Sequence, residues 1–225
     1  MKDLLTPKQI ARAMNVSESS IKRWCDGGAI ATQYTAGGHR KVSIAALLDF
    51  ARRTKHQVVR PEALGLPSTS GQTDRVVARA CEQMTDALVA GEEVRCRQIA
   101  VDLYLAGHSV SVICDDVLAA AFKQIGERWS CGDAEVYQER RGCVIATHVL
   151  QDLRTIIAPP ANGAPVAIGG AAEDDQYNLG TSMAELVLRS CDWDARSLGS
   201  NLPFDTLAQA IRDHQRKLFW LRCSP

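Results

Sequence analysis

Two segments rich in proline, glycine and small polar residues divide this 225-residue chain into three parts. Residues 56–73 contain two prolines and two glycines, and residues 158–163 include two successive prolines. Such composition is typical of linkers, because proline and glycine interrupt both helical and strand patterns. The units expected on either side of these linkers are residues 1–55, 74–158 and 164–225.

The first part has the pattern of two short helices joined by a turn. Thr6 and Ser17 each precede a run with apolar residues at helical spacing, so both are expected N-caps. Gly27-Gly28 can end the second helix. Two short extended runs around Gly37-Gly38 predict a hairpin, or wing, and Ser43 is expected to cap a third helix. The sequence therefore predicts a winged helix-turn-helix.

The charge of the chain is zero overall but is unevenly distributed. Residues 1–60 contain 11 Lys and Arg against 4 Asp and Glu, whereas residues 61–225 contain 15 against 22. A basic unit joined to a larger acidic body suggests that the basic unit contacts a polyanion such as double-stranded DNA.

A helix-turn-helix places the first turns of its second helix in the major groove of DNA, where Arg and Lys read guanine. Cationic side chains on the hairpin suit the phosphate backbone or the minor groove. The alternative is that these charges form an ordinary solvated face. The candidate DNA-binding residues are Ser17, Ser19, Lys22 and Arg23 on the second helix and Thr35, Gly37, Gly38, His39, Arg40 and Lys41 on the hairpin.

The second part is helical in pattern throughout, with breaks near Gly91, Gly107 and residues 131–133. Four helices of this length predict an antiparallel bundle. After the second linker the order becomes strand, helix, strand, helix, strand, which implies a parallel sheet with right-handed crossovers. The fold class expected is mainly α: a winged helix-turn-helix, a four-helix bundle and a partial, truncated Rossmann-like α/β unit. Gly169-Gly170 resembles part of a phosphate loop but lacks the rest of that fingerprint.

Several classes of protein are disfavoured. The chain has no apolar run of about 20 residues and no apolar signal core at its N-terminus, so we expect a cytoplasmic protein without a membrane segment. Its eight cysteines form no CxxC pair and are expected to be reduced core thiols. No Ser-His-Asp, Cys-His or metal-ligand arrangement is recognisable, so we expect neither an enzyme nor a metal site.

Two motifs carry a resemblance to known DNA-binding proteins. The runs Thr6-Pro7-Lys8-Gln9-Ile10-Ala11 and Thr35-Ala36-Gly37-Gly38-His39-Arg40-Lys41 resemble the winged helix-turn-helix of the MerR superfamily and of the excisionases. The resemblance covers residues 5–53. It implies DNA binding, either in transcription or, as in excisionases, as an architectural factor in recombination.

From about residue 75 the chain resembles the sensor half of light-responsive, adenosylcobalamin-dependent repressors of the same superfamily. Those proteins join a helical bundle to a Rossmann-like cobalamin-binding domain. In them, a Trp and a Glu-His pair cover the upper corrin face, and an acidic-x-His-x-x-Gly motif supplies the lower cobalt ligand. The ligand-site candidates that this resemblance implies are Trp129, Glu139, Arg140, Asp175, Tyr177 and Gly180.

The chain departs from that pattern at two positions: Arg140 and Tyr177 each stand where the family has a histidine. Imidazole is a good neutral ligand for a transition metal, whereas a phenol must lose a proton that it normally holds up to about pH 10. We therefore expect weak or absent binding of adenosylcobalamin, with a base-on corrinoid, another tetrapyrrole or a different small molecule as the alternatives. In the plain structural interpretation, Trp129 is a core aromatic, Glu139 an exposed acid, and Tyr177 packs near the first strand.

The function expected is a DNA-binding transcription regulator, a repressor, that acts as a homo-oligomer because paired half-sites give specific affinity. Its effector region resembles a cobalamin sensor that has lost its ligand. The alternatives are an excisionase-like architectural factor and a corrinoid-binding methyl-transfer protein.

Overall fold

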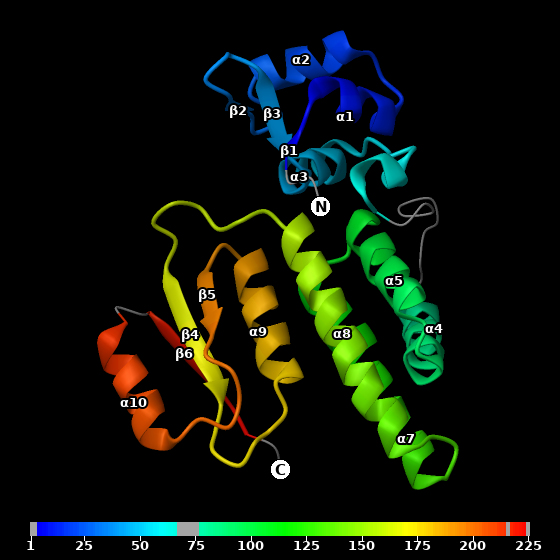
Figure 1. The fold of residues 1–225 in the computed structure, drawn as a ribbon, viewed down its shortest axis with the longest axis vertical. Coiled ribbons are helices and arrows are strands. Elements are labelled where there is room, and N and C mark those ends of the chain that lie inside the picture. Colours follow the sequence, from blue (N-terminus) through cyan, green and yellow to red (C-terminus); the bar gives the residue numbers. More distant parts are fainter. Residues whose placement is uncertain (1–3, 67–76, 215–216, 224–225) are drawn as a thin grey trace.

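The computed structural model describes residues 4–66, 77–214 and 217–223 (Figure 1). The chain is mainly helical and has two small three-stranded sheets, one antiparallel and one parallel. Figure 1 shows three units: the N-terminal unit (residues 4–66) at one end, and beneath it a helical unit (residues 77–156) beside an α/β unit (residues 166–222).

The N-terminal unit folds around a small antiparallel sheet with strand order β1-β3-β2. In chain order its helices and strands are β1 (Leu4–Leu5), α1 (Pro7–Met14), α2 (Glu18–Asp26), β2 (Gln33–Tyr34), β3 (Arg40–Ser43) and α3 (Ile44–Thr54). The predicted caps are confirmed: the hydroxyl oxygens of Thr6, Ser17 and Ser43 each accept a hydrogen bond from a backbone N–H in the first turn of α1, α2 and α3.

The core of this unit is formed by apolar side chains from all three helices. Ile10, Ile21 and Leu47 are completely buried, and the Trp24 and Phe50 rings lie 4.9 Å apart between centroids. Strand β1 was not predicted. Its two residues pair with β3, and Leu5 is buried in the process, so a two-residue strand is fixed by tertiary packing and not by local pattern.

Part of the predicted linker, residues 56–73, is folded. Pro61–Leu64 forms the 3-10 helix η1, and the Arg60 N–H donates a hydrogen bond to the Ala13 carbonyl at the end of α1. Val58, Leu64 and Leu66 are buried. The linker expectation is therefore wrong for residues 58–66, because their apolar side chains cover the N-terminal unit. Residues 67–73 of that expectation lie outside the described residues.

The helical unit packs α4, α5, α7 and α8 around a shared apolar core. Its elements are α4 (Val77–Ala90), α5 (Glu93–Leu105), α6 (Val110–Val112), η2 (Ile113–Ala119), α7 (Ala120–Ser130) and α8 (Val136–Ile156). Gly91 and Gly107, at two of the predicted breaks, adopt positive φ angles. The predicted third helix is continuous, but its middle part, η2, is a π-helix that packs on α4.

The α/β unit has the predicted order of alternating strands and helices: β4 (Val166–Ala171), α9 (Leu179–Ser190), β5 (Asp194–Ser197), α10 (Phe204–Asp213) and β6 (Leu218–Arg222). Both strand pairs are parallel, with strand order β5-β4-β6. The predicted Rossmann-like arrangement of a parallel sheet is confirmed. Gly169-Gly170 lies inside β4 rather than in a loop after it, so these glycines do not form a phosphate loop.

Helix α8 connects the three units, because it packs against α4 and α5, against α9 of the α/β unit and against α3 of the N-terminal unit. Helix α2 lies at the end of the N-terminal unit that is farthest from the helical unit (Figure 1). Within the described part of the chain, no helix is both long and apolar enough to cross a membrane.

Candidate functional site

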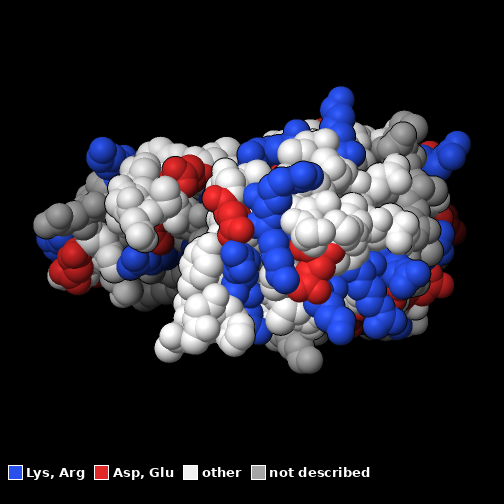
Figure 2. Space-filling model, turned by 90° about the horizontal axis from the view of Figure 1, so that it is seen from above, with Lys and Arg blue, Asp and Glu red and all other residues white. Residues whose placement is uncertain are grey.

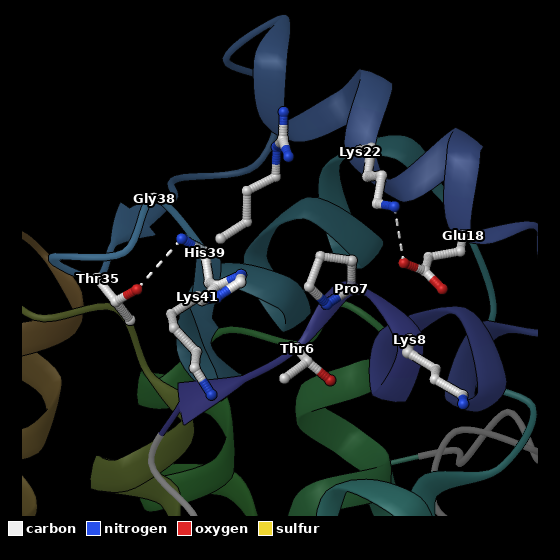
Figure 3. Close-up of a pocket in the computed structure, with 10 residues that line it drawn as sticks. Thr6, Pro7, Lys8, Glu18, Lys22, Thr35, Gly38, His39 and Lys41 are labelled. Carbon is white, nitrogen blue, oxygen red and sulfur yellow. Dashed lines mark hydrogen bonds and ion pairs between the residues drawn. The ribbon is translucent and has the colours of Figure 1, made fainter.

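The N-terminal unit carries a groove of about 460 Å³ between the start of α1, the exposed side of α2 and the β2–β3 hairpin (Figure 3). We call it the cationic groove. The residues that line it are Thr6, Pro7, Lys8, Glu18, Lys22, Thr35, Gly38, His39, Arg40 and Lys41. Figure 2, which looks onto this end of the molecule, shows Lys and Arg side chains spread over it with fewer Asp and Glu among them.

The tip of the hairpin is held by two hydrogen bonds to Thr35, one to its carbonyl and one to its side chain. The Gly38 N–H donates to the Thr35 carbonyl at 2.8 Å, and the His39 N–H donates to the Thr35 hydroxyl oxygen at 3.2 Å (Figure 3). Gly38 has a φ of +75°, a conformation that other residues rarely adopt. The tip is therefore a closed turn that presents His39 at the exposed end of the hairpin.

The candidates on α2 are divided between structural and accessible positions. Ser17 caps the helix, and its hydroxyl accepts the Ser20 N–H at 3.1 Å. Ser19, Lys22 and Arg23 are exposed, and Lys22 forms an ion pair of 2.9 Å with Glu18 one turn earlier. The first two turns of α2 thus present hydroxyl and cationic groups to the solvent.

Arg40 is held by a carboxylate. Its Nε and Nη2 atoms donate to the two carboxylate oxygens of Asp26, at 2.8 and 3.0 Å. The hydrogen bond to Asp26 raises the pKa of Arg40 above its ordinary value. Asp26 is the last residue of α2, so this contact joins the hairpin to the end of that helix.

Sequence reasoning missed two residues of this surface, Lys8 and Asp26. Lys8 is exposed at the start of α1 and lines the groove. A basic residue in the first turn of a capped helix was the available signal for Lys8. Asp26 gave no signal, because its partner Arg40 lies 14 residues away and on another element.

The ligand-site candidates come together only in part. Arg140 of α8 lies over the Tyr177 ring, 4.8 Å from its centroid, and Arg222 lies 5.9 Å from the same centroid. Asp175, which is 5% exposed, accepts hydrogen bonds from Arg222 Nη1 at 2.8 and 2.7 Å and from the Tyr177 N–H at 3.0 Å. These four residues form what we call the arginine–tyrosine cluster, which links the loop after β4, the end of β6 and α8.

The remaining candidates lie around this cluster. Gly180 lies under Arg222, and a Cβ atom at this position would collide with the arginine side chain. Glu139 is half-buried, accepts a hydrogen bond from the Cys143 thiol at 3.4 Å and lies 3.5 Å from Arg140. Trp129 is 58% exposed at the end of α7, so its interpretation as a core aromatic is wrong. Sequence reasoning missed Arg222, whose partner Asp175 precedes it by 47 residues.

The contacts within the arginine–tyrosine cluster can be compared with those needed to bind a corrin whose cobalt is ligated by a protein side chain. The position of the lower ligand carries a phenol, and Asp175 is bonded to Arg222 and to a backbone N–H instead of orienting an imidazole. Arg140 and Tyr177, at the two positions that would flank the ring, contact each other directly. The residues present do not fit a corrin with a protein-derived lower ligand.

A metal site of another kind is likewise missing from the part of the chain that the structure describes: no three His, Cys, Asp or Glu side chains there are grouped to hold a metal ion. His148 of α8 lies beside an acidic residue of another helix: its Nδ1 atom is 2.9 Å from a carboxylate oxygen of Glu93 in α5. One imidazole and one carboxylate are too few ligands for a structural metal site.

Comparison with known families supports two domains. Residues 4–55 match the family model described as a helix-turn-helix domain, and residues 80–151 match the model described as a B12 binding domain. The N-terminal unit is thus similar to helix-turn-helix domains, and most of the helical unit is similar to B12 binding domains. None of the curated proteins gives a significant match to the chain.

Solved structures resemble the fold at low sequence identity. The monomethylamine corrinoid protein of Methanosarcina barkeri superposes with a TM-score of 0.53 at 15% identity, over 66% of this chain and 71% of that chain. A cobalamin-binding protein of Desulfitobacterium hafniense DCB-2 gives a TM-score of 0.35 at 11% identity, covering 66% of this chain and 68% of its own. The methanol:cobalamin methyltransferase complex of Methanosarcina barkeri gives a TM-score of 0.35 at 14% identity, covering 78% of this chain and 69% of that chain.

Proposed function

We propose that this chain is a DNA-binding transcription regulator that acts through its N-terminal winged helix-turn-helix. The observation that carries the proposal is the cationic groove, which combines the exposed first turns of α2 with the wing, the β2–β3 hairpin. Arg23 and Lys22 would reach base edges in the major groove, while Lys8, His39 and Lys41 would contact the phosphate backbone. The match of residues 4–55 to a helix-turn-helix family supports this assignment.

We further propose that the regulator binds as a homo-oligomer and represses transcription. A single unit of about 55 residues buries little DNA surface, so specific affinity requires two half-sites about one or two helical turns apart. The sequence resemblance to repressors with an effector region of this order supports repression. In the proposal, the arginine–tyrosine cluster holds the effector region together without a protein-ligated corrin.

The test begins with selection of binding sites from a random duplex library, followed by fluorescence anisotropy on the selected duplex. We expect enrichment of paired half-sites and a strong decrease of affinity with salt. Arg23→Ala should cost about 1–3 kcal/mol of binding free energy, because one base contact is lost. Arg95→Ala, which removes an exposed arginine of α5 from the bundle, is the matched control and should bind like wild type.

Two results would overturn the regulator proposal. Equal binding by Arg23→Ala and wild type would remove α2 from the interface. DNA bending without an enriched common sequence would instead favour an architectural, excisionase-like factor. Repression itself is measured by transcription in vitro from a promoter that carries the selected site, where added protein should lower the transcript yield.

Corrinoid binding is the second candidate function, and the match of residues 80–151 to a B12 binding domain favours it. The measurement is dark incubation with adenosylcobalamin, followed by gel filtration and a visible spectrum of the protein peak. We expect a colourless peak at an unchanged elution volume, because Tyr177 and Arg140 occupy the positions of the two histidines. A corrin spectrum in the protein peak would establish the corrinoid function.

A further inference from the structure

Two of the cations that line the cationic groove already have a carboxylate partner. Lys22 pairs with Glu18 on its own helix, whereas Arg40 pairs with Asp26 on a different element. Among the described residues, neither Lys8 nor Lys41 has a carboxylate within ion-pair distance. The cations of the groove are therefore not equivalent.

Arg40 and Lys41 are successive residues of β3, so their side chains lie on opposite faces of the strand. Successive side chains of a β-strand point to opposite faces, so Arg40 shares a face of β3 with Val42, which is completely buried. That face points toward the helices of the unit, and Arg40 there meets Asp26. Lys41 points to the other face of β3. It lines the groove, as Arg40 does, but among the described residues no carboxylate lies within ion-pair distance of it.

The position of Asp26 also favours a structural role for the pair. A carboxylate in the last residue of a helix faces the negative end of the helix dipole, which is unfavourable unless a cation compensates it. Arg40 supplies this cation through two parallel N–H···O bonds, the geometry in which a guanidinium binds a carboxylate with the most directional restraint. The pair thus joins the wing to the end of α2.

We infer that Arg40 is a positioning residue that aligns the wing with the recognition helix α2 through Asp26, while Lys41 and Lys8 bind the phosphodiester backbone. The inference rests on the proposed function, because it assigns separate tasks to cations of the same DNA-binding surface. The ligand chemistry is that of a duplex phosphate backbone. A phosphate contact by Arg40 would have to replace or share the two bonds to Asp26.

The experiment compares the affinity for the selected duplex, over a range of salt concentrations, for wild type, Asp26→Asn, Arg40→Gln, the double variant and Lys41→Ala. We expect Asp26→Asn and Arg40→Gln each to weaken binding about two- to fivefold with an unchanged salt slope, since each releases one partly exposed ion pair. The double variant should be no weaker than either single variant. Lys41→Ala should lower the slope of log K against log[salt] by about 0.9, because one phosphate contact is lost.

Asp26→Glu and Arg95→Gln serve as controls. Asp26→Glu restores a carboxylate and should recover most of the affinity, while Arg95→Gln breaks a comparable exposed pair with Glu92 in the bundle and should have no effect. Thermal melting followed by circular dichroism checks that each variant is folded. If Asp26→Asn unfolds the unit, the comparison is made with Arg40→Lys, which keeps the charge but loses the two-point contact and should weaken binding like Arg40→Gln.

Two outcomes would overturn the inference. One is unchanged or tighter binding by Asp26→Asn, as expected if Asp26 only competes with DNA for Arg40. The other is a salt slope reduced by about one in Arg40→Gln, which would make Arg40 a phosphate contact. Failure of the wild-type protein to bind any duplex would instead overturn the proposed function, so the two failures are distinguishable.

Discussion

At the scale of single residues, burial controls the chemistry of the cysteines. Burial raises the pKa of the Cys96, Cys114 and Cys143 thiols to about 12, and in Cys143 the neighbouring Glu139 carboxylate adds to this effect. Since the thiolate is the reactive form, these residues should be inert near neutral pH. Cys131, Cys191 and Cys223 are exposed.

Alkylation should therefore separate the two sets of thiols. In native protein treated with iodoacetamide at pH 8, we expect Cys131, Cys191 and Cys223 to be modified first. Peptide mass spectrometry measures the extent at each site, and a sample unfolded in urea, where all eight thiols should react, is the control. Early modification of Cys114 in the native protein would contradict its placement in the core.

The same shifts predict loss of stability at alkaline pH. In the folded state the pKa values of Cys96 and Cys114 are about 12, above the ordinary value of 9.0. The unfolded chain therefore releases these protons first as the pH rises, so their contribution to stability is complete below about pH 9 and decreases from there toward pH 12. The midpoint of urea unfolding, measured from pH 7 to 10.5 under reducing conditions, should fall above pH 9. For Cys114→Ala, the decrease of the urea midpoint from its value at pH 7 should be smaller than the decrease seen for wild type.

Residue types and their local spacing predicted part of the candidate sites. The hydroxyl caps Thr6, Ser17 and Ser43 follow from sequence because a cap bonds to a backbone N–H three residues away. Asp26 and Arg222 could not be predicted in this way. Their partners are 14 and 47 residues distant, and only the folded chain brings them together.

At the scale of secondary-structure elements, the central strand β4 depends on its glycines. A Cβ atom at Gly169 would overlap the ring and the carbonyl oxygen of Trp220 in the neighbouring strand β6, and one at Gly170 would come within 2.9 Å of the Gly199 carbonyl oxygen. Strand β6 and the loop after β5 can approach β4 this closely only because these two positions lack side chains.

Gly169→Ala should therefore destabilise the α/β unit by about 1–3 kcal/mol, because β6 must move to accommodate one extra methyl group. Gly126→Ala is the matched control: Gly126 lies in the interior of α7, and an added Cβ there meets no atom within 4 Å. That control should raise stability by about 0.5–1 kcal/mol through helix propensity. Urea unfolding followed by tryptophan fluorescence measures both changes, and equal stability of the two variants would contradict the close contact of β4 with β6.

The order and type of most elements could be predicted from apolar periodicity. The expected order of strand, helix, strand, helix and strand is observed in the α/β unit, from β4 to β6. The π-helical segment η2 and the 3-10 helix η1 could not be predicted, because both depend on packing against α4 and α1 and not on a local pattern.

At the scale of the whole molecule, side-chain contacts between units join the N-terminal unit to the body. The Arg52 guanidinium of α3 lies 4.1 Å from the centroid of the Tyr104 ring, and its Nη2 atom donates to the His108 carbonyl at 3.3 Å. Arg97 of α5 donates to the Gly65 carbonyl at 3.3 Å and pairs with Asp152 of α8 at 2.9 Å. No local pattern in the sequence indicated this docking, since the contacts of Arg52 with Tyr104 and of Arg97 with the Gly65 carbonyl join residues of different units.

Arg52→Ala should therefore loosen the N-terminal unit from the body without unfolding either. A partly buried cation–π contact contributes about 1–2 kcal/mol, so differential scanning calorimetry should show the transitions of the two units moving apart, and small-angle X-ray scattering should show a larger radius of gyration. Arg53→Ala is the control, because Arg53 bonds only to Asp49 and Ala29 within its own unit among the described residues. Identical scattering and calorimetry of the two variants would show that the Arg52 contact does not hold the units together. A larger radius in Arg52→Ala alone would show that this contact holds the N-terminal unit against the body.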